Sequence, residues 1–270
     1  MFTAYKDAHV VVTGGANGIG KALALGFAKR GANVAVVDIH GDEAKAVAAE
    51  ITAMGCKSIA IQADVSVLDE CAKVYDTVMD AFGRCDVLVN DAGVSALSDV
   101  EHIPEKDLRW VFETNVYSHW FMMQKFLPQM RKQGTHCQIL NVCSIAGLIS
   151  MNGAPAYFSS KHAAVALSEC VYKQLKAENA DIDVSIFCPG YVQTEMPLTD
   201  RHRPERFAIH DDEPYYHTEQ YAGMVAFNKM LLDNGAPLDT AVETIFTALE
   251  KEQFYILDSA KYERLLCEQG

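Results

Sequence analysis

The sequence predicts one α/β domain in which a parallel sheet of about seven strands is covered by helices on both faces. Three observations lead to this prediction. Short apolar runs rich in valine and isoleucine alternate with helical stretches along most of the chain. These runs are continuously apolar, which is typical of strands buried on both faces. The chain has 270 residues, half of them hydrophobic, which is enough for one such core.

The order of the predicted elements favours a doubly wound sheet. Strands that alternate with helices form right-handed βαβ units, and glycine just after a helical stretch is a common helix end. The predicted strands cover residues 9–13, 33–38, 58–62, 86–90, 137–142, 182–188 and 254–257. The predicted helices cover residues 19–30, 42–54, 67–82, 105–131 and 239–249, and the first three end just before a glycine.

The charge balance and the cysteines narrow the class of protein. Acidic residues outnumber basic ones by 36 to 23, giving a net charge of −13, which argues against nucleic acid or an anionic membrane as the main partner. No run of about 18 apolar residues occurs, so no membrane span is expected. The N-terminal residues lack a signal-peptide core, and the eight cysteines form no Cys-x-x-Cys pair. We therefore expect a cytoplasmic protein with reduced cysteines and no metal site.

One region, residues 190–238, interrupts the alternation of strands and helices. It contains no clean strand, four prolines and a charged, histidine-bearing stretch at residues 199–217. An insertion of this length is more often functional than idle, so we interpret residues 194–221 as a substrate lid within a single domain spanning residues 1–270. The alternative is a surface loop whose aromatic residues seal its own base. The lid residues expected to face a substrate are Met196, Arg201, His202, Arg203, Phe207, Tyr215 and Tyr216.

A glycine-rich turn joins the first strand to the first helix. Residues 13–20 read Thr-Gly-Gly-Ala-Asn-Gly-Ile-Gly. The first glycines permit a tight turn that a pyrophosphate can approach closely, and the helix N-terminus faces its negative charge. This context predicts a Rossmann-type dinucleotide site, although the glycines alone would also be explained by a tight turn. The predicted contacts are Gly14, Asn17, Gly18, Ile19 and Gly20.

Asp38 ends the second strand, about 20 residues after the turn. A carboxylate there accepts hydrogen bonds from both ribose hydroxyls of the adenosine and repels a 2′-phosphate. No arginine or lysine lies in the turn to attract such a phosphate. We therefore predict NAD rather than NADP as the cofactor, against the alternative that Asp38 is an ordinary carboxylate at a strand end.

Tyr157 and Lys161 lie four residues apart in a helical stretch, so their side chains share one face. A phenol has a pKa of about 10, and a nearby ammonium stabilises the phenolate. Ser144 follows the strand at residues 137–142, and strand ends in this fold face the ligand crevice. The three residues predict proton transfer at an alcohol or ketone oxygen. A Tyr-x-x-x-Lys pair alone would more often be a helix surface pair.

The combination resembles the short-chain dehydrogenase/reductase family over nearly the whole chain up to about residue 194. The resemblance implies a nicotinamide-dependent oxidoreductase. The matching segments are the glycine turn, an Asp-Val pair at Asp64 and Val65, the Asn-Asp-Ala-Gly stretch at residues 90–93, the set Ser144, Tyr157 and Lys161, and Pro-Gly-Tyr-Val-Gln-Thr at residues 189–194.

The resemblance also implies a role for each matched residue. Tyr157 would be the acid–base, Lys161 would tune it and bind the nicotinamide ribose, and Ser144 would orient the substrate. Asn115 would support a proton-relay water near the lysine. Asp64 and Val65 would contact the adenine. The further cofactor contacts implied are Asn90, Ala92, Gly93, Pro189, Gly190, Val192 and Thr194.

Two departures from the family pattern affect what the resemblance implies. Asp91 replaces the usual second asparagine of the Asn-Asn-Ala-Gly stretch, a change we interpret as structural rather than catalytic. The C-terminus lacks the glycine-rich strand end typical of tetrameric members, so we favour a homodimer over a tetramer. The dimer would use the helix at residues 105–131 and the helix that carries Tyr157, whose stripe of Ala164, Leu167, Val171 and Leu175 is equally consistent with a core-facing position.

The residues expected around the reacting centre are mostly apolar, which favours a hydrophobic or aromatic secondary alcohol or ketone. Two alternatives stay open: an NADP-dependent carbonyl reductase, and an NAD-binding scaffold of the same fold without activity. Epimerisation is disfavoured because too few residues remain for a larger substrate domain. The predicted substrate residues are Ser144, Ile145, Met151, Tyr157 and Tyr191, with Val94, Ala96 and Gly153 nearby.

Overall fold

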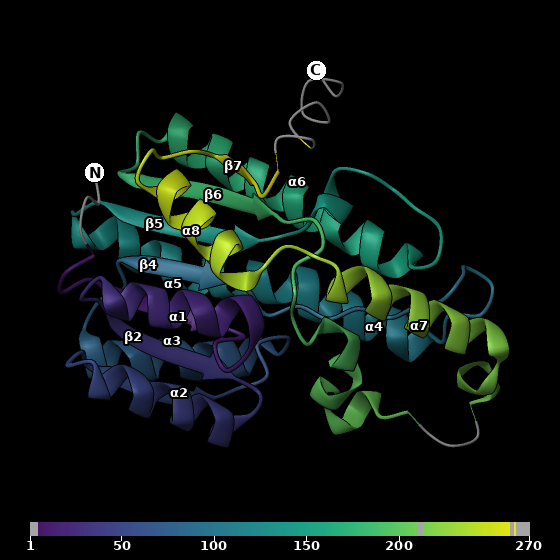
Figure 1. Cartoon of the computed structure of the whole chain (residues 1–270). Helices are drawn as coiled ribbons and strands as arrows, with labels where there is room; N and C mark the ends of the chain where they lie inside the picture. Colours follow the sequence, from purple (N-terminus) through teal and green to yellow (C-terminus); the bar gives the residue numbers. More distant parts are fainter. Residues whose placement is uncertain (1–4, 210–212, 260–261, 263–270) are drawn as a thin grey trace.

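All seven predicted strands form one parallel sheet with the order β3-β2-β1-β4-β5-β6-β7 (Figure 1). The computed structural model describes residues 5–209, 213–259 and 262. The predicted Rossmann-type fold is therefore confirmed. The strands are β1 His9–Thr13, β2 Asn33–Asp38, β3 Ser58–Gln62, β4 Val87–Asn90, β5 Cys137–Val142, β6 Ile182–Cys188 and β7 Tyr255–Leu257.

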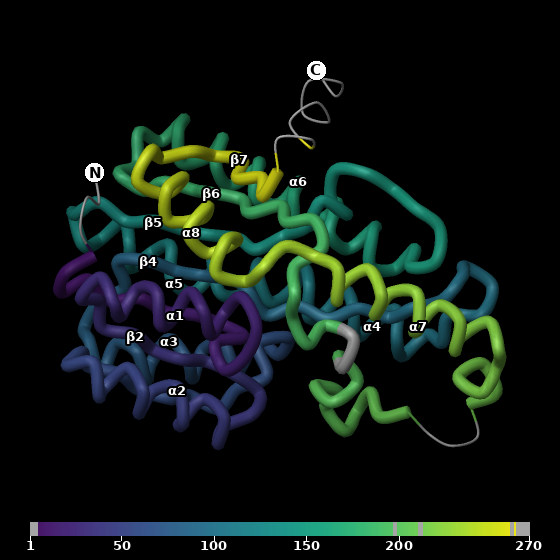
Figure 2. The backbone as a smooth tube through the Cα atoms, in the orientation of Figure 1, coloured from purple at the N-terminus to yellow at the C-terminus, as the bar shows by residue number. Residues whose placement is uncertain are grey.

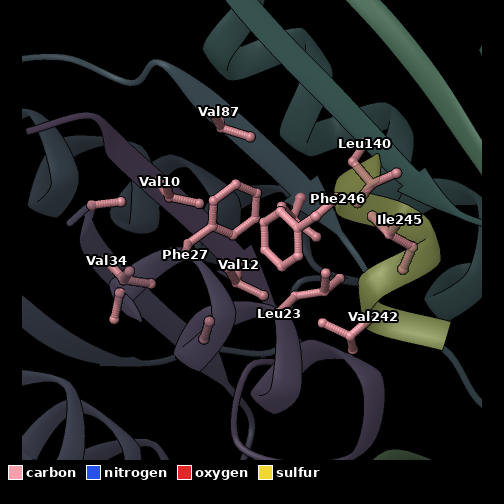
Figure 3. Close-up of a cluster of buried hydrophobic side chains, with 14 of the residues drawn as sticks. Val10, Val12, Leu23, Phe27, Val34, Val87, Leu140, Val242, Ile245 and Phe246 are labelled. Carbon is pink, nitrogen blue, oxygen red and sulfur yellow. The ribbon is translucent and has the colours of Figure 1, made fainter. Parts of the chain in front are cut away.

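Helices cover both faces of the sheet, and each face has its own apolar core. Side chains of α1, α2 and α8 pack on one face, where the rings of Phe27 and Phe246 meet at 4.9 Å (Figure 3). Side chains of α3, α5 and α6 pack on the other, around Phe126 and Met122. The helices are α1 Gly18–Lys29, α2 Gly41–Ala53, α3 Leu68–Phe82, α4 Glu105–Phe112, α5 Ser118–Gln133, α6 Pro155–Ala177, α7 Glu219–Asp233 and α8 Leu238–Leu249.

The apolar stripe on α6 belongs mainly to this core. Ala164 and Leu175 are fully buried, and Leu167 and Val171 pack against the core beneath α5 and α6. The core-facing interpretation of the stripe therefore holds within one chain.

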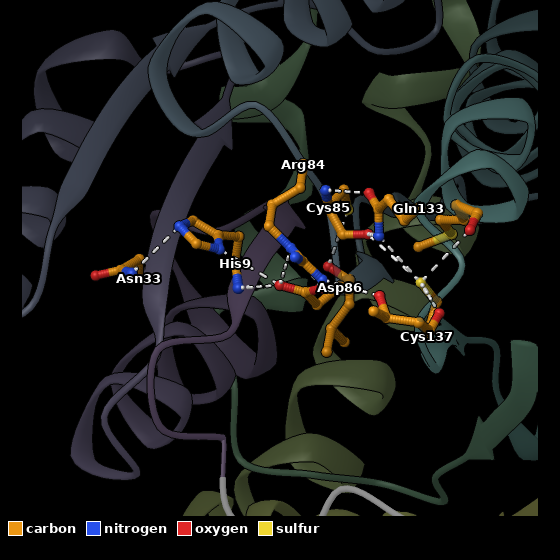
Figure 4. A network of polar contacts seen from close by, with 10 residues as sticks. His9, Asn33, Arg84, Cys85, Asp86, Gln133 and Cys137 are labelled. Atoms are coloured by element: carbon orange, nitrogen blue, oxygen red, sulfur yellow. Dashed lines mark hydrogen bonds and ion pairs between the residues drawn. The ribbon is translucent and has the colours of Figure 1, made fainter.

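The two edges of the sheet differ in their chemistry. At the amino edge, the backbone N–H of His9 donates to Asp86 at 2.8 Å, and Arg84 Nε donates to the same carboxylate at 2.9 Å (Figure 4). Gln133 clasps the backbone of Cys85, accepting from its N–H and donating to its carbonyl. These contacts tie the strand starts together. The carboxyl edge is where this fold binds ligands. The binding position lies at β1, because the strand order runs from β1 to β3 on one side and from β4 to β7 on the other.

The helix predicted over residues 105–131 is interrupted in its middle. α4 passes into a π-helical turn at Glu113–Tyr117 before α5 begins at Ser118, so the predicted helix is present but contains a π turn that the sequence did not indicate. A π turn holds one extra residue per turn, and such turns are frequent at functional sites. The turn contains Asn115, which is completely buried.

Residues 190–238 contain no strand in their described part, as expected, but they do contain a helix that the sequence did not predict. Three short 3₁₀ turns at Met196–His202, Glu205–Phe207 and Pro214–His217 precede α7. Figure 2 shows this part of the chain beside α4, and its Arg201 also lies 3.6 Å from Glu43 of α2. Only Leu232 of α7 is fully buried, so its sequence carries little of the apolar periodicity that marks a helix.

Candidate active site

A cavity of about 500 Å³ opens at the carboxyl edge of the sheet, between the strand ends and the lid. This size falls within the usual range for small-molecule sites. Gly20 and Asn90 lie just behind its wall, where Asn90 is fully buried and donates to Asn141 at 2.8 Å. The predicted cofactor residues that line the cavity are Gly14, Asn17, Gly18, Ile19, Asp38, Asp64, Val65, Ala92, Gly93, Tyr157, Lys161, Pro189, Gly190, Val192 and Thr194.

The glycine turn has the geometry that its sequence predicts. Gly14 and Gly18 have φ of +65° and +53°, a conformation that side-chain-bearing residues rarely adopt. A Cβ on Gly20 would lie 2.2 Å from the carbonyl oxygen of Gly14, so no larger residue fits there. The turn therefore brings bare backbone and the N-terminus of α1 to the cavity wall, an arrangement suited to an anion.

Asp38 is buried at the end of β2 and held by two backbone donors. Its Oδ2 accepts from the N–H of Ala16 at 3.0 Å, and its Oδ1 accepts from the N–H of His40 at 3.0 Å. Each carboxylate oxygen keeps a second lone pair for a ligand hydroxyl. The structure thus presents a fixed carboxylate at the cavity, in direct hydrogen-bond contact with the glycine turn through Ala16.

Asp91 has a carboxyl group whose shifted pKa was not predicted from the sequence. Its Oδ2 lies 3.4 Å and 2.6 Å from the positions that a Cβ would take on Gly14 and Gly20, so it sits beneath the glycine turn. Burial raises the pKa of this carboxyl to about 7, while Lys161 and the Gly20 N–H oppose the rise. The carboxyl of Asp91 therefore changes charge near neutral pH.

Tyr157, Lys161 and Ser144 meet at the other end of the cavity. The ammonium of Lys161 lies 5.9 Å from the ring centroid of Tyr157 and donates to the Val142 carbonyl at 3.2 Å. Lys161 is buried, with 3% of its surface exposed, so its charge is poorly screened. Ser144 lines the same space, and its Oγ accepts from the Ala146 N–H at 3.1 Å.

The turn after β5 packs closely on α6, and this contact positions Ser144. A Cβ on Gly147 would lie 2.7 Å from the carbonyl oxygen of Lys161, so glycine allows the 3₁₀ turn Ile145–Gly147 to rest directly on the helix. Ser144 caps that turn and is fixed relative to Tyr157 by it.

Asn115 fixes the loop beside Lys161. Its Oδ1 accepts from the Val94 N–H at 2.8 Å, and its Nδ2 donates to the Val94 carbonyl at 2.9 Å and to Ser160 Oγ at 3.0 Å. A Cβ on Gly93 would lie 3.4 Å from both Asn115 Oδ1 and Lys161 Nζ, so Gly93 separates the two side chains. The side chain of Asn115 is thus occupied with positioning this loop.

His119, four residues after Asn115, was not identified from the sequence. It is completely buried, and neither ring nitrogen has a hydrogen-bond partner within the described residues. Burial and the nearby Lys161 ammonium lower the pKa of His119 to about 3, so the ring is neutral at physiological pH. The spacing from Asn115 was the one available signal, since it places both residues on the same helix face.

Comparison with known proteins agrees with this geometry. The family model for short chain dehydrogenases matches residues 8–204. The chain belongs to the short-chain dehydrogenase family. A crystal structure of a short chain dehydrogenase/reductase from Burkholderia phymatum in complex with NAD has a TM-score of 0.92, is 27% identical, and is matched over 96% of this chain and 92% of its own.

Two curated relatives with similar sequences carry different enzyme names. A protein of Lactiplantibacillus plantarum called CLA biosynthesis dehydrogenase/reductase is 37% identical over 262 residues, or 97% of this chain and 91% of the relative. A diacetyl reductase [(S)-acetoin forming] of Staphylococcus epidermidis is 33% identical over 69% of this chain and 72% of its own. The chain is therefore an oxidoreductase of this family.

The substrate end of this short-chain dehydrogenase is walled mainly by apolar side chains. Ile145, Met151, Tyr191 and Val94 line the cavity, as predicted from their positions. Ala96 does not line it and instead packs in a small core with Trp110 and Phe207, which corrects that prediction. Further lining residues that the sequence did not identify are Leu97, Ile149, Phe158, Asn228 and Leu232.

Most of the named lid residues of this dehydrogenase support the lid rather than face the cavity. Phe207 and Tyr215 are buried, and Tyr216 donates its hydroxyl proton to Asp107 at 2.7 Å. Arg203 pairs with Asp107 at 2.7 Å, also buried, and its guanidinium lies 4.1 Å from the Trp110 ring centroid. Met196 and His202 do line the cavity.

The described residues of this short-chain dehydrogenase contain no cluster of side chains able to hold a metal ion. Within the same residues, no helix is both long and apolar enough to span a bilayer.

Proposed function

We propose that the protein is an NAD-dependent alcohol dehydrogenase or ketone reductase that acts on a hydrophobic or aromatic secondary alcohol or its ketone. One observation carries the proposal: a single cavity has Tyr157, Lys161 and Ser144 at one end, and the glycine turn with Asp38 at the other. The first set handles a proton at an oxygen atom, and the second suits a dinucleotide.

Tyr157 performs the acid–base step in this proposal. The buried Lys161 ammonium lies 5.9 Å from the Tyr157 ring centroid, and the tyrosine oxygen exchanges a proton with the substrate O–H. Ser144 donates a hydrogen bond to the same substrate oxygen and holds it beside the phenol. When bound, NAD supplies the acceptor for the hydride that leaves the carbinol carbon. In the reductive direction Tyr157 returns its proton to the developing alkoxide.

The polar groups at the adenosine end favour NAD over NADP. Asp38 is ready to accept from ribose hydroxyls, and a phosphate there would meet its negative charge. The lid residue Arg201 is close enough to matter, but it is paired with Glu195 at 2.8 Å and lies 3.6 Å from Glu43. Its charge is therefore already balanced by carboxylates. The Burkholderia phymatum relative, crystallised with NAD, adds support.

The substrate class rests on the apolar wall, and the reaction class rests on the names of the relatives. Ile145, Ile149, Met151 and Leu232 line the cavity that also holds Tyr157, and such a wall favours a substrate with an apolar body. Both the CLA biosynthesis relative and the diacetyl reductase are named as reductases or dehydrogenases. An idle NAD-binding scaffold is disfavoured because Ser144, Tyr157, Lys161 and Asn115 are all in place.

The homodimer expected from the sequence stays a prediction. It is supported by Tyr117 and Trp120, two large side chains that are about half exposed on the outer face of the helix pair α4–α5.

The experiment that tests the function is to follow absorbance of the reduced cofactor with NAD and a panel of secondary alcohols of increasing apolar size. Tyr157→Phe removes the transferring hydroxyl and should lower the rate at least about 10²-fold with NAD binding retained. Tyr172→Phe is the matched control, because Tyr172 lies on the same helix and packs against Phe254 away from the cavity. Normal turnover by Tyr157→Phe would show the assignment to be wrong. Tight NAD binding without turnover of any alcohol or ketone would favour the idle scaffold.

A further inference from the structure

Arg206 reaches from the lid to the wall of the cavity at the end of β3. Its Nη1 donates to Asp64 Oδ2 at 2.6 Å, and its Nη2 donates to Ser66 Oγ at 2.6 Å. A weaker contact of 3.4 Å joins Nη2 to Glu113. One guanidinium therefore links the lid with the loop after β3, 142 residues earlier in the chain.

Asp64 is held in one orientation by this contact. Its Oδ1 accepts from both the N–H and the hydroxyl of Ser66, at 3.1 Å and 2.5 Å, while Arg206 occupies one side of Oδ2. A carboxylate oxygen has two lone pairs, so Oδ2 keeps one acceptor position that Arg206 does not use. Asp64 and Val65 line the cavity next to the strand that ends in Asp38.

If Asp38 binds the adenosine ribose, as the proposed function requires, the attached base must lie over the neighbouring strand end. That end is β3, which pairs with β2 so that Gln62 faces Asp38, and Asp64 follows two residues later. The exocyclic amine of adenine is a donor that matches the remaining lone pair of Asp64. Arg206 then borders the place that this geometry gives to the base.

The segment that carries Arg206 is anchored independently of the cavity. Arg203 pairs with Asp107 of α4, stacks on Trp110 and donates to the Phe207 carbonyl at 3.2 Å. The 3₁₀ turn Glu205–Phe207 is thereby fixed on α4. Earlier in the lid, the Nδ1 atom of His202 lies 2.9 Å from the Nε2 atom of His40, near Asp38.

The same lid also touches the substrate end. Met196 and Thr199 line the cavity, and Thr199 Oγ1 accepts from the Ser95 N–H at 3.3 Å. A contact that fixes the lid at the adenine end thus sets the position of residues at the substrate end. Pairing of Arg206 with Asp64 is a link between the two, beside the contact of His202 with His40.

We propose that Arg206 is a positioning residue that makes closure of the lid depend on the adenosine half of the cofactor. It rests on the proposed function, because it takes NAD as the ligand. Asp64 receives the adenine amine on one lone pair and Arg206 on the other, and the guanidinium packs against the base. Adenosine binding and the ordered lid then stabilise each other. The nicotinamide half of the cofactor contacts neither Asp64 nor Arg206 and takes no part in this coupling.

The test compares Arg206→Ala with the wild-type protein for three ligands: NAD, AMP, and nicotinamide mononucleotide, which lacks the adenosine. The Arg206 side chain is 39% exposed, so a modest effect is expected. We expect Kd for NAD and for AMP to rise by the same factor, about 3- to 10-fold, which corresponds to one screened, charge-assisted contact. Kd for nicotinamide mononucleotide should not change. Arg206→Lys keeps the charge but loses the two-armed contact, so it should fall between the two proteins.

Arg109→Ala is the matched control, because Arg109 forms an exposed pair with Glu105 on α4 and does not line the cavity. It should bind all three ligands as the wild type does. Equal or tighter binding of NAD by Arg206→Ala would overturn the proposal, since Arg206 would then only compete with the adenine for Asp64. An equal loss for nicotinamide mononucleotide would overturn it as well, since the variant would be generally damaged. If the wild type binds neither NAD nor AMP, the proposed function itself fails.

Limited digestion with trypsin measures how accessible the lid is to the protease. The wild-type lid offers Arg201 and Arg206 as cleavage sites, because trypsin does not cut the Arg203–Pro204 bond, and the variant retains Arg201. We expect AMP to slow cleavage within residues 201–206 of the wild type and to leave the cleavage rate of Arg206→Ala unchanged. Equal protection of both proteins would show that another contact closes the lid.

Discussion

Asp91 is the residue whose charge should control how stability depends on pH. Its carboxyl lies beneath the glycine turn, and burial raises its pKa to about 7, with Asp38 adding to the rise and Lys161 opposing it. In an unfolded chain an aspartate titrates near pH 4. Between about pH 4 and pH 7 the folded protein therefore keeps a proton that the unfolded chain has lost.

The sign and size of the effect follow from this difference. A group that binds its proton more tightly when folded favours folding at low pH, so this contribution to stability declines as pH rises from about 4 to 7 and stays low above that. A shift of about 3 pKa units corresponds to at most about 4 kcal/mol at about 1.4 kcal/mol per unit. Part of Asp91 borders the open cavity, so we expect about 2 kcal/mol between pH 5 and pH 8.

Asp91→Asn removes the titration but keeps an oxygen that can accept from the Gly20 N–H. The thermal midpoints of the variant and the wild type should be close at pH 5 and should separate by about 4–8 °C in favour of the variant at pH 8. Asp76→Asn, an exposed position on α3, is the control and should shift neither curve. A difference between Asp91→Asn and the wild type that is constant from pH 5 to pH 8 would refute the reasoning.

Two further variants test the cofactor and the lid. Asp38→Ala should weaken NAD binding about 10-fold, because two ribose hydrogen bonds are lost. It should also bring the Kd values of NAD and NADP closer together, because the repulsion of a 2′-phosphate is lost as well. Unchanged NAD affinity would contradict the ribose role of Asp38. Asp107→Asn leaves the buried Arg203 with the half-exposed Asp200 as its carboxylate partner and should lower the free energy of unfolding by about 2 kcal/mol, as measured in urea. A cost below about 0.5 kcal/mol would mean that this pair does not hold the lid.

The sheet and the two ends of the site were predictable because each leaves a local mark in the sequence. The strands are unbroken apolar runs, and the glycine turn needs glycine where φ is positive or where the Gly14 carbonyl approaches within 2.2 Å of a Cβ at position 20. Tyr157 and Lys161 carry their relation in their spacing. Ser144 follows from its place just beyond a strand.

The features that were missed depend on contacts between distant residues. The π turn at Glu113–Tyr117 adds one residue to a helix, which changes the register without changing the apolar pattern at either end. The lid gains its order from Arg203 and Asp107, which are 96 residues apart. Burial and the nearby Lys161 lower the pKa of His119, whereas burial raises the pKa of Asp91 against the opposing charge of Lys161, and no local pattern encodes these surroundings.

The net charge of −13 does not show that carboxylates at the cavity have basic side chains nearby. A dinucleotide brings a pyrophosphate to a wall that already carries Asp38, Asp64 and Asp91. The lid supplies the nearest compensation, since Arg206 pairs with Asp64 and Arg201 lies against Glu43, while Lys161 offsets Asp91 from inside. A lid that moved away would leave these carboxylates facing the phosphates with less opposing charge. In the proposed function, the insertion at residues 190–238 therefore contributes to the cofactor site through Arg201 and Arg206 as well as through Gly190, Val192 and Thr194, the contacts that the sequence predicted there.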